Sequence, residues 1–384
     1  MGLEVDSWIG ILGGGQLGRM LSLDARRMGF KVLTWTGGDL SGAANTADQI
    51  IDDPFEDPKA LEKFSSSVNV ATVEFENLPR EILEHLEQIV PLHPSSHVVS
   101  ICQNREREKK FLSQKGFSCA EFKIADDYTS FHKGVAEMNA ETIVKTAEFG
   151  YDGKGQQRLQ KNASEELLEK TWKTFENGRV VIEECISLEA EISVIVARST
   201  NGEIAVYDPA ENIHRNHILD ISIVPARIDP LIIAQAKEVS LAIVDELQYV
   251  GILAIEFFVS SSGKLLVNEL APRPHNSGHH TINSCFCSQF ENQARAISGL
   301  PLGSTRLHSS VVMMNLLGDV WAAGKNHPDF ASLLSTPGTS LHLYGKNGAR
   351  QGRKMGHVTF TGENQNVVLD AVNKARELLS MPKI

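Results

Sequence analysis

The chain has 384 residues, of which 42% are hydrophobic and 22% are charged, and its formal net charge is −11. This length predicts two or three packed domains, and the composition excludes general disorder and a membrane protein. The acidic balance would repel a phosphate backbone, which excludes nucleic acid as the main partner but leaves room for a local basic pocket for a small anion.

The longest apolar runs, such as Gly251–Val259 and Val311–Leu317, are too short to span a bilayer, and the first residues lack the basic region and cleavage pattern of a signal peptide. We therefore expect a cytoplasmic protein with no membrane partner. The five cysteines form no paired framework and no C-x-x-C clamp, so we expect free thiols, with Cys285 and Cys287 buried.

The first hundred residues alternate short apolar runs with helix-like stretches. Strands are predicted at Trp8–Leu12, Phe30–Trp35 and Val70–Phe75, and helices at Gln16–Met28 and Arg80–Gln88. This alternation is typical of parallel βαβ units with helices on both faces of a sheet. A linker is predicted at 92–96, and helix resumes at Asn104–Lys115.

From Glu141 the pattern changes to β-rich segments around amphipathic helices, which indicates a second, α+β domain. The predicted strands are Thr142–Lys145, Val180–Glu183, Glu191–Ala197 and Gly251–Val259, and the helices are Ser164–Phe175 and Pro230–Leu247. Beyond residues 300–303 the chain predicts strands at Ser309–Leu317 and Ser340–Tyr344, a loop rich in Gly, Arg and Lys, and a closing helix at Val367–Leu379. This last part is too small to be a separate enzyme.

Directly after the first strand, residues 13–18 read Gly-Gly-Gly-Gln-Leu-Gly and match G-x-G-x-x-G at the start of a helix. Unpaired N–H groups and the helix macrodipole favour an anion there. The loop could hold the phosphate of a dinucleotide or of another ligand, or it could be a tight structural turn. A dinucleotide would need an acid after the second strand, where the nearby acid, Asp39, follows two glycines.

A second glycine-rich segment, Gly-Tyr-Asp-Gly-Lys-Gly-Gln at 150–156, allows close approach to a ligand and movement as a lid. It is not a Walker A motif, because Gln156 stands where that motif has Lys followed by Ser or Thr. The alternative is an ordinary flexible hairpin.

Two acidic residues are predicted to face each other across a hairpin. If residues 261–264 form the loop, Glu256 and Glu269 lie on the same side of the ladder, with Cβ atoms about 5 Å apart. Their repulsion among apolar neighbours would be removed by a divalent cation, and Glu256, Glu269 and Asn268 supply oxygen ligands that suit Mg²⁺. The alternatives are a solvated face or a register shifted by one residue.

Residues 271–280, Ala-Pro-Arg-Pro-His-Asn-Ser-Gly-His-His, follow directly. A rigid chain there could present Arg273, His275 and Asn276 to an anionic substrate. A zinc site at His279 and His280 is disfavoured, because adjacent residues of a strand point to opposite faces. Their default role is hydrogen bonding within the loop.

The segment 345–357 concentrates basic residues in an acidic chain, which indicates either a phosphate clamp or a solvated loop. By contrast, Arg105, Glu108 and Lys109 fit an ordinary charged helix face.

Six segments, in this order, resemble 5-(carboxyamino)imidazole ribonucleotide synthetase, an ATP-grasp family of bacterial purine synthesis. They are GGGQLGRM at 13–20, VEFENLP at 73–79, GYDGKGQ at 150–156, NELAPRPHNSGHHT at 268–281, SQFENQARAI at 288–297 and YGKNGARQGRKMGH at 344–357. The resemblance implies an N-terminal doubly wound parallel-sheet domain at 1–103, an ATP-grasp domain at 104–302 with a mobile lobe at about 141–190, and a small β-rich domain at 303–384.

The resemblance also implies a reaction, in which ATP, bicarbonate and 5-aminoimidazole ribonucleotide give the N-carboxylated ribonucleotide, ADP and phosphate through carboxyphosphate. ATP and two Mg²⁺ ions would be the cofactors, and the protein would be a homodimer. Some relatives carry a fused mutase domain, and because this chain ends at Ile384 we expect a separate mutase to act on the product.

The family's site residues map onto this chain as expectations. The implied ATP contacts are Arg105 and Lys145 at the phosphates, Gly150, Asp152, Gly153, Lys154, Gly155 and Gln156 in the loop, Glu183, Glu184, Cys185 and Ile186 at the adenine, Glu191 at the ribose, His214, Asn268 and Glu269. Mg²⁺ would be held by Glu256, Glu269 and Asn268. The ribonucleotide would contact Gln16, Leu17 and Glu76, with its phosphate at Lys346, Arg353 and Lys354.

The implied catalytic residues are Tyr151 and Asp152, in the loop that would close over the carboxyphosphate, and Arg273, His275 and Asn276, which would bind the bicarbonate-derived group. Asp152 is the candidate for orienting or deprotonating the amine. Two positions depart from the family pattern. Gln351 replaces a proline of the basic loop, which should loosen it, and Cys185 stands where a larger apolar residue is expected at the adenine.

Three other functions are weighed against this one. Formate-dependent glycinamide ribonucleotide transformylase shares the ATP-grasp scaffold but is less similar at 276–281 and 352–357. A nucleotide-binding protein without turnover could dispense with Glu256 and Glu269, which are both present. An NAD-dependent oxidoreductase would need a nicotinamide pocket, for which the sequence gives no convincing sign.

Overall fold

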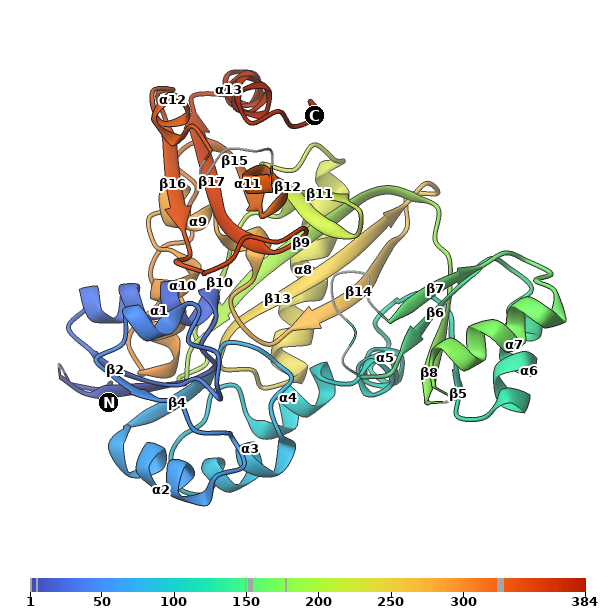
Figure 1. Ribbon diagram of the computed structural model, residues 1–384, viewed down its shortest axis with the longest axis horizontal. Coiled ribbons are helices and arrows are strands. Elements are labelled where there is room, and N and C mark those ends of the chain that lie inside the picture. Colours follow the sequence, from blue (N-terminus) through green and yellow to red (C-terminus); the bar gives the residue numbers. More distant parts are fainter. Residues whose placement is uncertain (1, 5, 149, 151–154, 177, 323–327) are drawn as a thin grey trace.

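The computed structural model describes residues 2–4, 6–148, 150, 155–176, 178–322 and 328–384. These residues form three sheets, of four, nine and four strands. In Figure 1 the N-terminal sheet lies at the lower left and the smaller sheet at the right, and the central sheet runs through the middle between them.

The N-terminal sheet is parallel and has helices on both faces, as predicted. Its order is β3 (Gln49–Ile51), β2 (Lys31–Trp35), β1 (Trp8–Leu12) and β4 (Val70–Val73). Helices α2 (Pro58–Ser67) and α3 (Arg80–Glu87) share one apolar core with the sheet, whereas α1 (Gln16–Arg27) and α10 (Gln289–Ile297) share the other. Since β1 and β4 are neighbours with Leu12 opposite Val73, the loops that follow them meet at one edge.

The segment predicted as a linker is shorter than expected. Ser95 accepts a hydrogen bond from Val98 N and caps α4 (Ser96–Cys102), because a serine hydroxyl can satisfy a free N–H at a helix start. Asn104 caps α5 (Arg105–Gln114) in the same way. The chain between the N-terminal sheet and the rest is therefore largely helical.

The smaller sheet has the order β5 (Phe122–Ala125), β8 (Val180–Glu184), β6 (Thr142–Thr146) and β7 (Gln156–Leu159). Helices α6 (Tyr128–Met138) and α7 (Glu165–Thr174) pack on it around Phe131 and Trp172, whose ring centroids are 5.3 Å apart. Only residues 185–187 separate β8 from the central sheet.

The central sheet is antiparallel and continues into the C-terminal part of the chain. Its order is β14 (Leu265–Ala271), β13 (Gly251–Ser260), β9 (Leu188–Arg198), β11 (Ala210–Arg215), β12 (Ile218–Val224), β15 (Ser310–Leu317), β17 (Lys354–Gly362) and β16 (Thr339–Leu343), and β10 (Ile204–Val206) pairs with β9. Helix α8 (Pro230–Glu246) packs against β9, β13 and β14, and α13 (Gln365–Leu378) against β15 and β17. The short elements are η1 (Ala43–Asn45), η2 (Asn276–Gly278), α9 (Thr281–Ser284), α11 (Asp319–Ala322) and α12 (Phe330–Leu334).

One C-terminal prediction is wrong in extent. Residues 354–357 belong to strand β17 and not to the loop, because His357 and its neighbours pair with β15 on one side and β16 on the other. This pairing fixes Lys354 at the start of a strand, which restrains its main chain.

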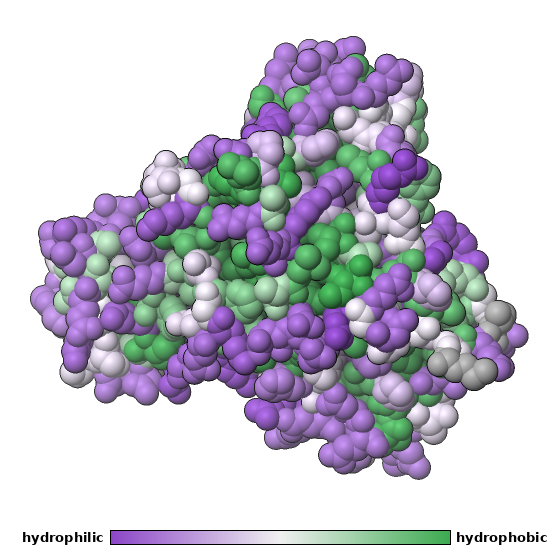
Figure 2. Space-filling model, turned by 180° about the vertical axis from the view of Figure 1, so that it is seen from behind, coloured by the Kyte–Doolittle hydropathy of each residue, from purple (hydrophilic) through white to green (hydrophobic). Residues whose placement is uncertain are grey.

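Three features predicted from composition can be compared with the structure: membrane-spanning helices, the cysteines and the surface. Within the described ranges, no helix is long and apolar enough to cross a membrane. The five cysteines are free, and Cys285 and Cys287 are buried as predicted. On the face opposite to that of Figure 1, apolar residues gather in the middle and are bordered by hydrophilic ones (Figure 2).

Candidate active site

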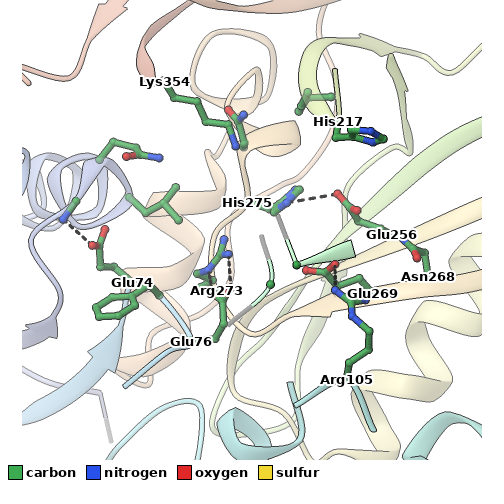
Figure 3. A pocket seen from close by; sticks show the side chains of 18 of the residues that line it. Glu74, Glu76, Arg105, His217, Glu256, Asn268, Glu269, Arg273, His275 and Lys354 are labelled. Carbon is green, nitrogen blue, oxygen red and sulfur yellow. Dashed lines mark hydrogen bonds and ion pairs between the residues drawn. The ribbon is translucent and has the colours of Figure 1, made fainter. Parts of the chain in front are cut away.

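A cavity of about 770 Å³ lies where the three sheets meet, and it gathers most of the predicted site residues. The predicted residues that line it are Gln16, Leu17, Glu76, Arg105, Lys145, Gly150, Gly155, Gln156, Glu191, His214, Glu256, Asn268, Glu269, Arg273, His275, Asn276 and Lys354. Figure 3 shows Arg273 and His275 in the centre of the view, with Glu256, Asn268, Glu269 and Arg105 on one side and Glu74 on the other.

The carboxylates of the central sheet face each other as predicted, although the register differs. Glu256 pairs with Glu269, but Val259 pairs with Leu265 and the register shifts between Glu256 and Phe257. Asn268 is the extra residue of this β-bulge, which re-aims side chains at a strand edge. The bulge therefore brings Glu256 opposite Glu269. This is the same pairing that the predicted loop at 261–264 would give in a regular hairpin.

The donor set at this pair suits a divalent cation. Burial and the neighbouring Glu269 raise the pKa of Glu256 to about 7, which is the signature of two carboxylates without sufficient compensation. The Oδ1 atom of Asn268 is buried without a hydrogen-bond partner. Because the described residues contain no group of three His, Cys, Asp or Glu side chains arranged to hold a metal, the third protein ligand would be this amide oxygen.

Lys145 lies in a buried charge network that the sequence did not predict. Its ammonium is 3.0 Å from Glu183 Oε1, and the fully buried Lys109 is 3.3 Å from Glu183 Oε2. Burial opposes ionisation of Glu183, but the two lysines and Arg105 hold its pKa at about 2. Burial lowers the pKa of Lys145 to about 8. An anionic ligand beside Lys145 would stabilise its charged form.

The predicted adenine segment differs from the rest of the site. Glu183 directs its carboxylate to the lysines, and Glu184, Cys185 and Ile186 are half-buried residues that do not line the cavity. Cys185 N donates to Glu141 O at 2.9 Å, which ties the segment to the smaller sheet. Glu191 does line the cavity, with its Oε2 3.2 Å from His214 Nδ1.

The glycine loop at 13–18 already holds an anion of the protein itself. The buried Glu74 carboxylate accepts hydrogen bonds from Gly15 N at 2.5 Å and from Gly18 N at 2.8 Å. A Cβ atom at Gly13 or Gly15 would lie 2.3 or 2.6 Å from this side chain. In this structure the carboxylate takes these two donors, so a phosphate at the loop would have to bind groups other than the amides of Gly15 and Gly18.

Glu76 and Arg273 bind each other across the cavity wall. Arg273 Nε lies 2.5 Å from Glu76 Oε2, and Nη2 lies 3.1 Å from Oε1, in a two-pronged ion pair. Burial opposes ionisation of Glu76, but Arg273 holds the pKa of this carboxyl below its ordinary value. The two residues, predicted for different substrates, thus form one unit that joins β4 to the end of β14.

His275 and Asn276 extend the site beyond this pair. His275 Nε2 is 3.4 Å from Glu256 Oε1, and its Nδ1 is 2.9 Å from Ser277 Oγ. Burial and Arg273 lower the pKa of His275 well below its ordinary value, which keeps the ring neutral. The amide of Asn276 is buried, and neither its oxygen nor its nitrogen has a hydrogen-bond partner in the described structure.

The basic residues of segment 345–357 are only partly gathered at the cavity. Lys354 lines it. Lys346 donates to Gln16 Oε1 at 2.6 Å, and Arg353 donates to the carbonyls of Asn347 and Gly348. Neither Lys346 nor Arg353 lines the cavity in this conformation.

His279 and His280 have the hydrogen-bonding role expected of them. His279 Nδ1 lies 3.2 Å from Gln289 Nε2, and His280 Nδ1 lies 2.9 Å from Ser284 Oγ. The predicted residues Tyr151, Asp152, Gly153 and Lys154 lie outside the described residues.

Several residues at the site were missed. Glu74, His217, Leu188 and Phe258 line the cavity, and Lys109 supports Lys145 through Glu183. For Glu74 a signal existed, since an acid directly after β4 must face the loop after the adjacent β1. The prediction of an ordinary charged helix face for Lys109 and Glu108 is wrong, because both side chains are buried.

Family models match three consecutive parts of the chain. The ribonucleotide synthetase preATP-grasp domain matches residues 7–103, the ATP-grasp domain residues 110–290, and the phosphoribosylaminoimidazole carboxylase C-terminal domain residues 311–371.

Individual relatives agree with these matches. The N5-carboxyaminoimidazole ribonucleotide synthase of Bacillus subtilis is 42% identical over 352 residues, which cover 92% of this chain and 90% of the relative. The ADP complex of an N5-carboxyaminoimidazole ribonucleotide synthetase has a TM-score of 0.90 at 39% identity and covers 98% of this chain and 97% of its own. The Aspergillus clavatus synthase in complex with ADP and 5-aminoimidazole ribonucleotide has a TM-score of 0.85 at 26% identity, with coverage of 98% and 99%. The chain therefore belongs to the N5-carboxyaminoimidazole ribonucleotide synthase family of ATP-grasp ligases.

Proposed function

We propose that this protein catalyses the ATP-dependent carboxylation of 5-aminoimidazole ribonucleotide with bicarbonate in purine biosynthesis, giving the N-carboxylated ribonucleotide, ADP and phosphate. One observation carries the proposal: Glu256, Glu269 and the unpartnered Asn268 Oδ1 lie in the same cavity as Arg105 and Lys145. Two cations and an acid pair whose charge is only partly compensated suit a magnesium-bound triphosphate. The names of the relatives support the choice of substrates.

In the first step a bicarbonate oxygen attacks the γ-phosphorus of ATP, and the bond to the bridging oxygen breaks as ADP leaves. Arg105 and Lys145 offset the negative charge of the phosphates and so favour approach of an anionic nucleophile. Bound Mg²⁺, held by Glu256, Glu269 and Asn268, would supply further screening of that charge. The product of this step is carboxyphosphate.

In the second step the exocyclic amine of the ribonucleotide bonds to the carboxyl carbon, either of carboxyphosphate or of CO₂ released from it, and phosphate departs. Arg273 and the Asn276 amide supply donors for the carboxyl oxygens beside the metal-binding pair. His275, kept neutral by burial and by Arg273, which lower its pKa, can donate a hydrogen bond to the bicarbonate-derived group without adding charge. Tyr151 and Asp152 stay predicted contributors through the resemblance.

The ribonucleotide would lie on the side of the cavity formed by Gln16, Leu17 and Glu76, with its phosphate near Lys354. Lys346 would turn from Gln16 to this phosphate, because a charged acceptor binds an ammonium more strongly than an amide does. Because Glu74 accepts from the amides of Gly15 and Gly18, we place the phosphate at the basic residues and not on these two amides.

The finer features of the proposal rest on the family resemblance. They are the use of Mg²⁺, a homodimer, a cytoplasmic location, a separate mutase that consumes the product, and domain boundaries after residues 103 and 302.

The test is ADP release by purified protein with Mg²⁺, ATP and bicarbonate, measured with and without 5-aminoimidazole ribonucleotide. We expect release that depends on this ribonucleotide. A parallel reaction with glycinamide ribonucleotide and formate serves as the control. Turnover with only the glycinamide pair would move the activity to the transformylase, and no turnover with either pair would indicate a nucleotide-binding protein without catalysis.

A further inference from the structure

Helix α10 carries three fully buried carboxamides, Gln289, Asn292 and Gln293, in a segment that supplies no residue to the cavity. A buried amide is costly unless its hydrogen bonds are made, so each one indicates what it holds in place. Asn292 bonds to Tyr207 and Gly303, and Gln293 bonds to Ile252 N and Thr72 Oγ1.

Gln289 differs from the other two because it binds the main chain of a residue that lines the cavity. Its Oε1 accepts from His275 N at 2.9 Å, and its Nε2 donates to His275 O at 2.8 Å. The two bonds together imitate the pairing of a neighbouring β-strand. They also fix the orientation of the amide, because only an oxygen can accept from the His275 N–H.

The surrounding residues hold Gln289 itself in position. Its Nε2 lies 3.2 Å from His279 Nδ1, and its own main-chain N donates to Thr281 Oγ1 at 3.0 Å. A Cβ atom at Gly278 would lie 2.6 Å from Gln289 Oε1, so this glycine is needed for the amide to reach His275. The clamp is therefore built from both the helix and the loop that it holds.

The clamp has a direct consequence for the site. His275 places its imidazole 3.4 Å from Glu256, and it lines the cavity together with Arg273, two residues earlier in the chain (Figure 3). Because a displacement of about 1 Å can cost on the order of 10²-fold in rate, a group with two main-chain bonds to a rigid helix is better placed than one in a free loop.

We propose that Gln289 is a positioning residue for the reaction, acting through the main chain of His275. This inference rests on the proposed function, since it takes His275 and its neighbours as the place where the carboxyl group is bound. It assigns to α10 the task of setting the distance between the His275 loop and the acid pair of the central sheet.

The first test compares Gln289→Glu with Asn292→Asp. Both exchange a fully buried amide of the same helix for an acid of the same shape, and both lose amide donors, but Asn292 makes no bond to the His275 loop. We expect Gln289→Glu to lower kcat for ribonucleotide-dependent ADP release by about 10²-fold, with KM for ATP within about twofold. We expect Asn292→Asp to keep kcat within about threefold. Equal kcat values for the two folded variants would overturn the proposal.

A second variant avoids the buried charge. Gly278→Ala should push Gln289 away from His275 and lower kcat in the same way, again with KM for ATP unchanged. If Gln289→Glu fails to fold, this variant decides, and an unchanged kcat would overturn the proposal.

Placement can also be tested without turnover. A crystal structure of Gly278→Ala should show the His275 main chain displaced relative to Glu256, and an unmoved His275 would contradict the clamp. Absence of ribonucleotide-dependent ADP release by the unmutated protein would instead refute the proposed function, so the two failures are distinguishable.

Discussion

Two pairs of glutamates face the cavity from opposite sides, and they differ in what compensates their charge. On the N-terminal side, Glu74 accepts two main-chain N–H bonds and Glu76 holds Arg273 in a two-pronged pair. On the central sheet, Glu269 lies 3.5 Å from Arg105, whereas Glu256 lies 3.4 Å from a neutral histidine.

All four residues are glutamates, so residue type alone does not separate their roles. The difference in charge compensation does. A carboxylate whose lone pairs are taken by the protein shapes the site, whereas an acid pair that stays under-compensated at neutral pH needs a cation from solution. The first pair therefore organises the cavity wall, and the second is where we expect metal and triphosphate.

The largest effect should come from the under-compensated pair. Glu269→Gln removes a charge from the proposed metal-binding pair while keeping the shape of the side chain, so ADP release should fall by at least about 10²-fold. Steady-state assays with an unchanged circular dichroism spectrum would check this. Turnover near that of the unmutated protein would refute the metal assignment.

The compensated pair should instead affect stability. Glu76→Gln leaves the Arg273 guanidinium without its partner, and the free energy of unfolding should fall by about 2–3 kcal/mol, below the full cost for a deeply buried pair because both side chains retain some exposure. Urea denaturation measures this. Glu84→Gln, which breaks the exposed pair with Arg80, is the control and should cost less than about 1 kcal/mol. An equal loss in the free energy of unfolding for the two variants would show that the Glu76–Arg273 pair contributes no more than an exposed ion pair.

The pH dependence should report on Lys145. Its pKa of about 8 means that the ammonium is charged below this pH and neutral above it, so kcat/KM for ATP should fall as pH rises through about 8, approaching tenfold per pH unit. Lys145→Arg should move this decrease to higher pH, because arginine keeps its charge. An alkaline limb in the same place for both proteins would assign it to another group.

The smallest effect should come from Glu74→Gln. The amide can still accept from one glycine N–H, but its NH₂ group would face the other, so stability should fall by about 1 kcal/mol, as for loss of a helix cap. Thermal unfolding would measure the change. A variant as stable as the unmutated protein would mean that these two bonds contribute nothing net.

Much of this arrangement could be predicted from local pattern. The parallel sheet followed from alternating apolar and amphipathic runs. The facing of Glu256 and Glu269 was predicted from a four-residue loop, but the structure reaches this pairing through the bulge at Asn268. Patterns of this kind depend on residues close in sequence, for which periodicity is informative.

The misses share the opposite property. The glycine motif predicted free amides, but the group that binds them, Glu74, lies 59 positions beyond Gly15. Lys109 reaches Asn268 O over 159 positions, and Gln289 reaches His275 from a separate helix. Such contacts are set by how the sheets pack, which spacing along the chain does not encode. For Glu74, the adjacency of β1 and β4 in the sheet was the one available clue.

The central claim is that the Glu256 and Glu269 pair, and not the Glu74 and Glu76 pair, binds the metal. The direct measurement is calorimetric titration of ATP, with Mg²⁺ or with EDTA, into the unmutated protein, Glu256→Gln and Glu76→Gln. We predict that Mg²⁺ increases the affinity for ATP in the unmutated protein and in Glu76→Gln, but not in Glu256→Gln. A full Mg²⁺ effect in Glu256→Gln would contradict the account.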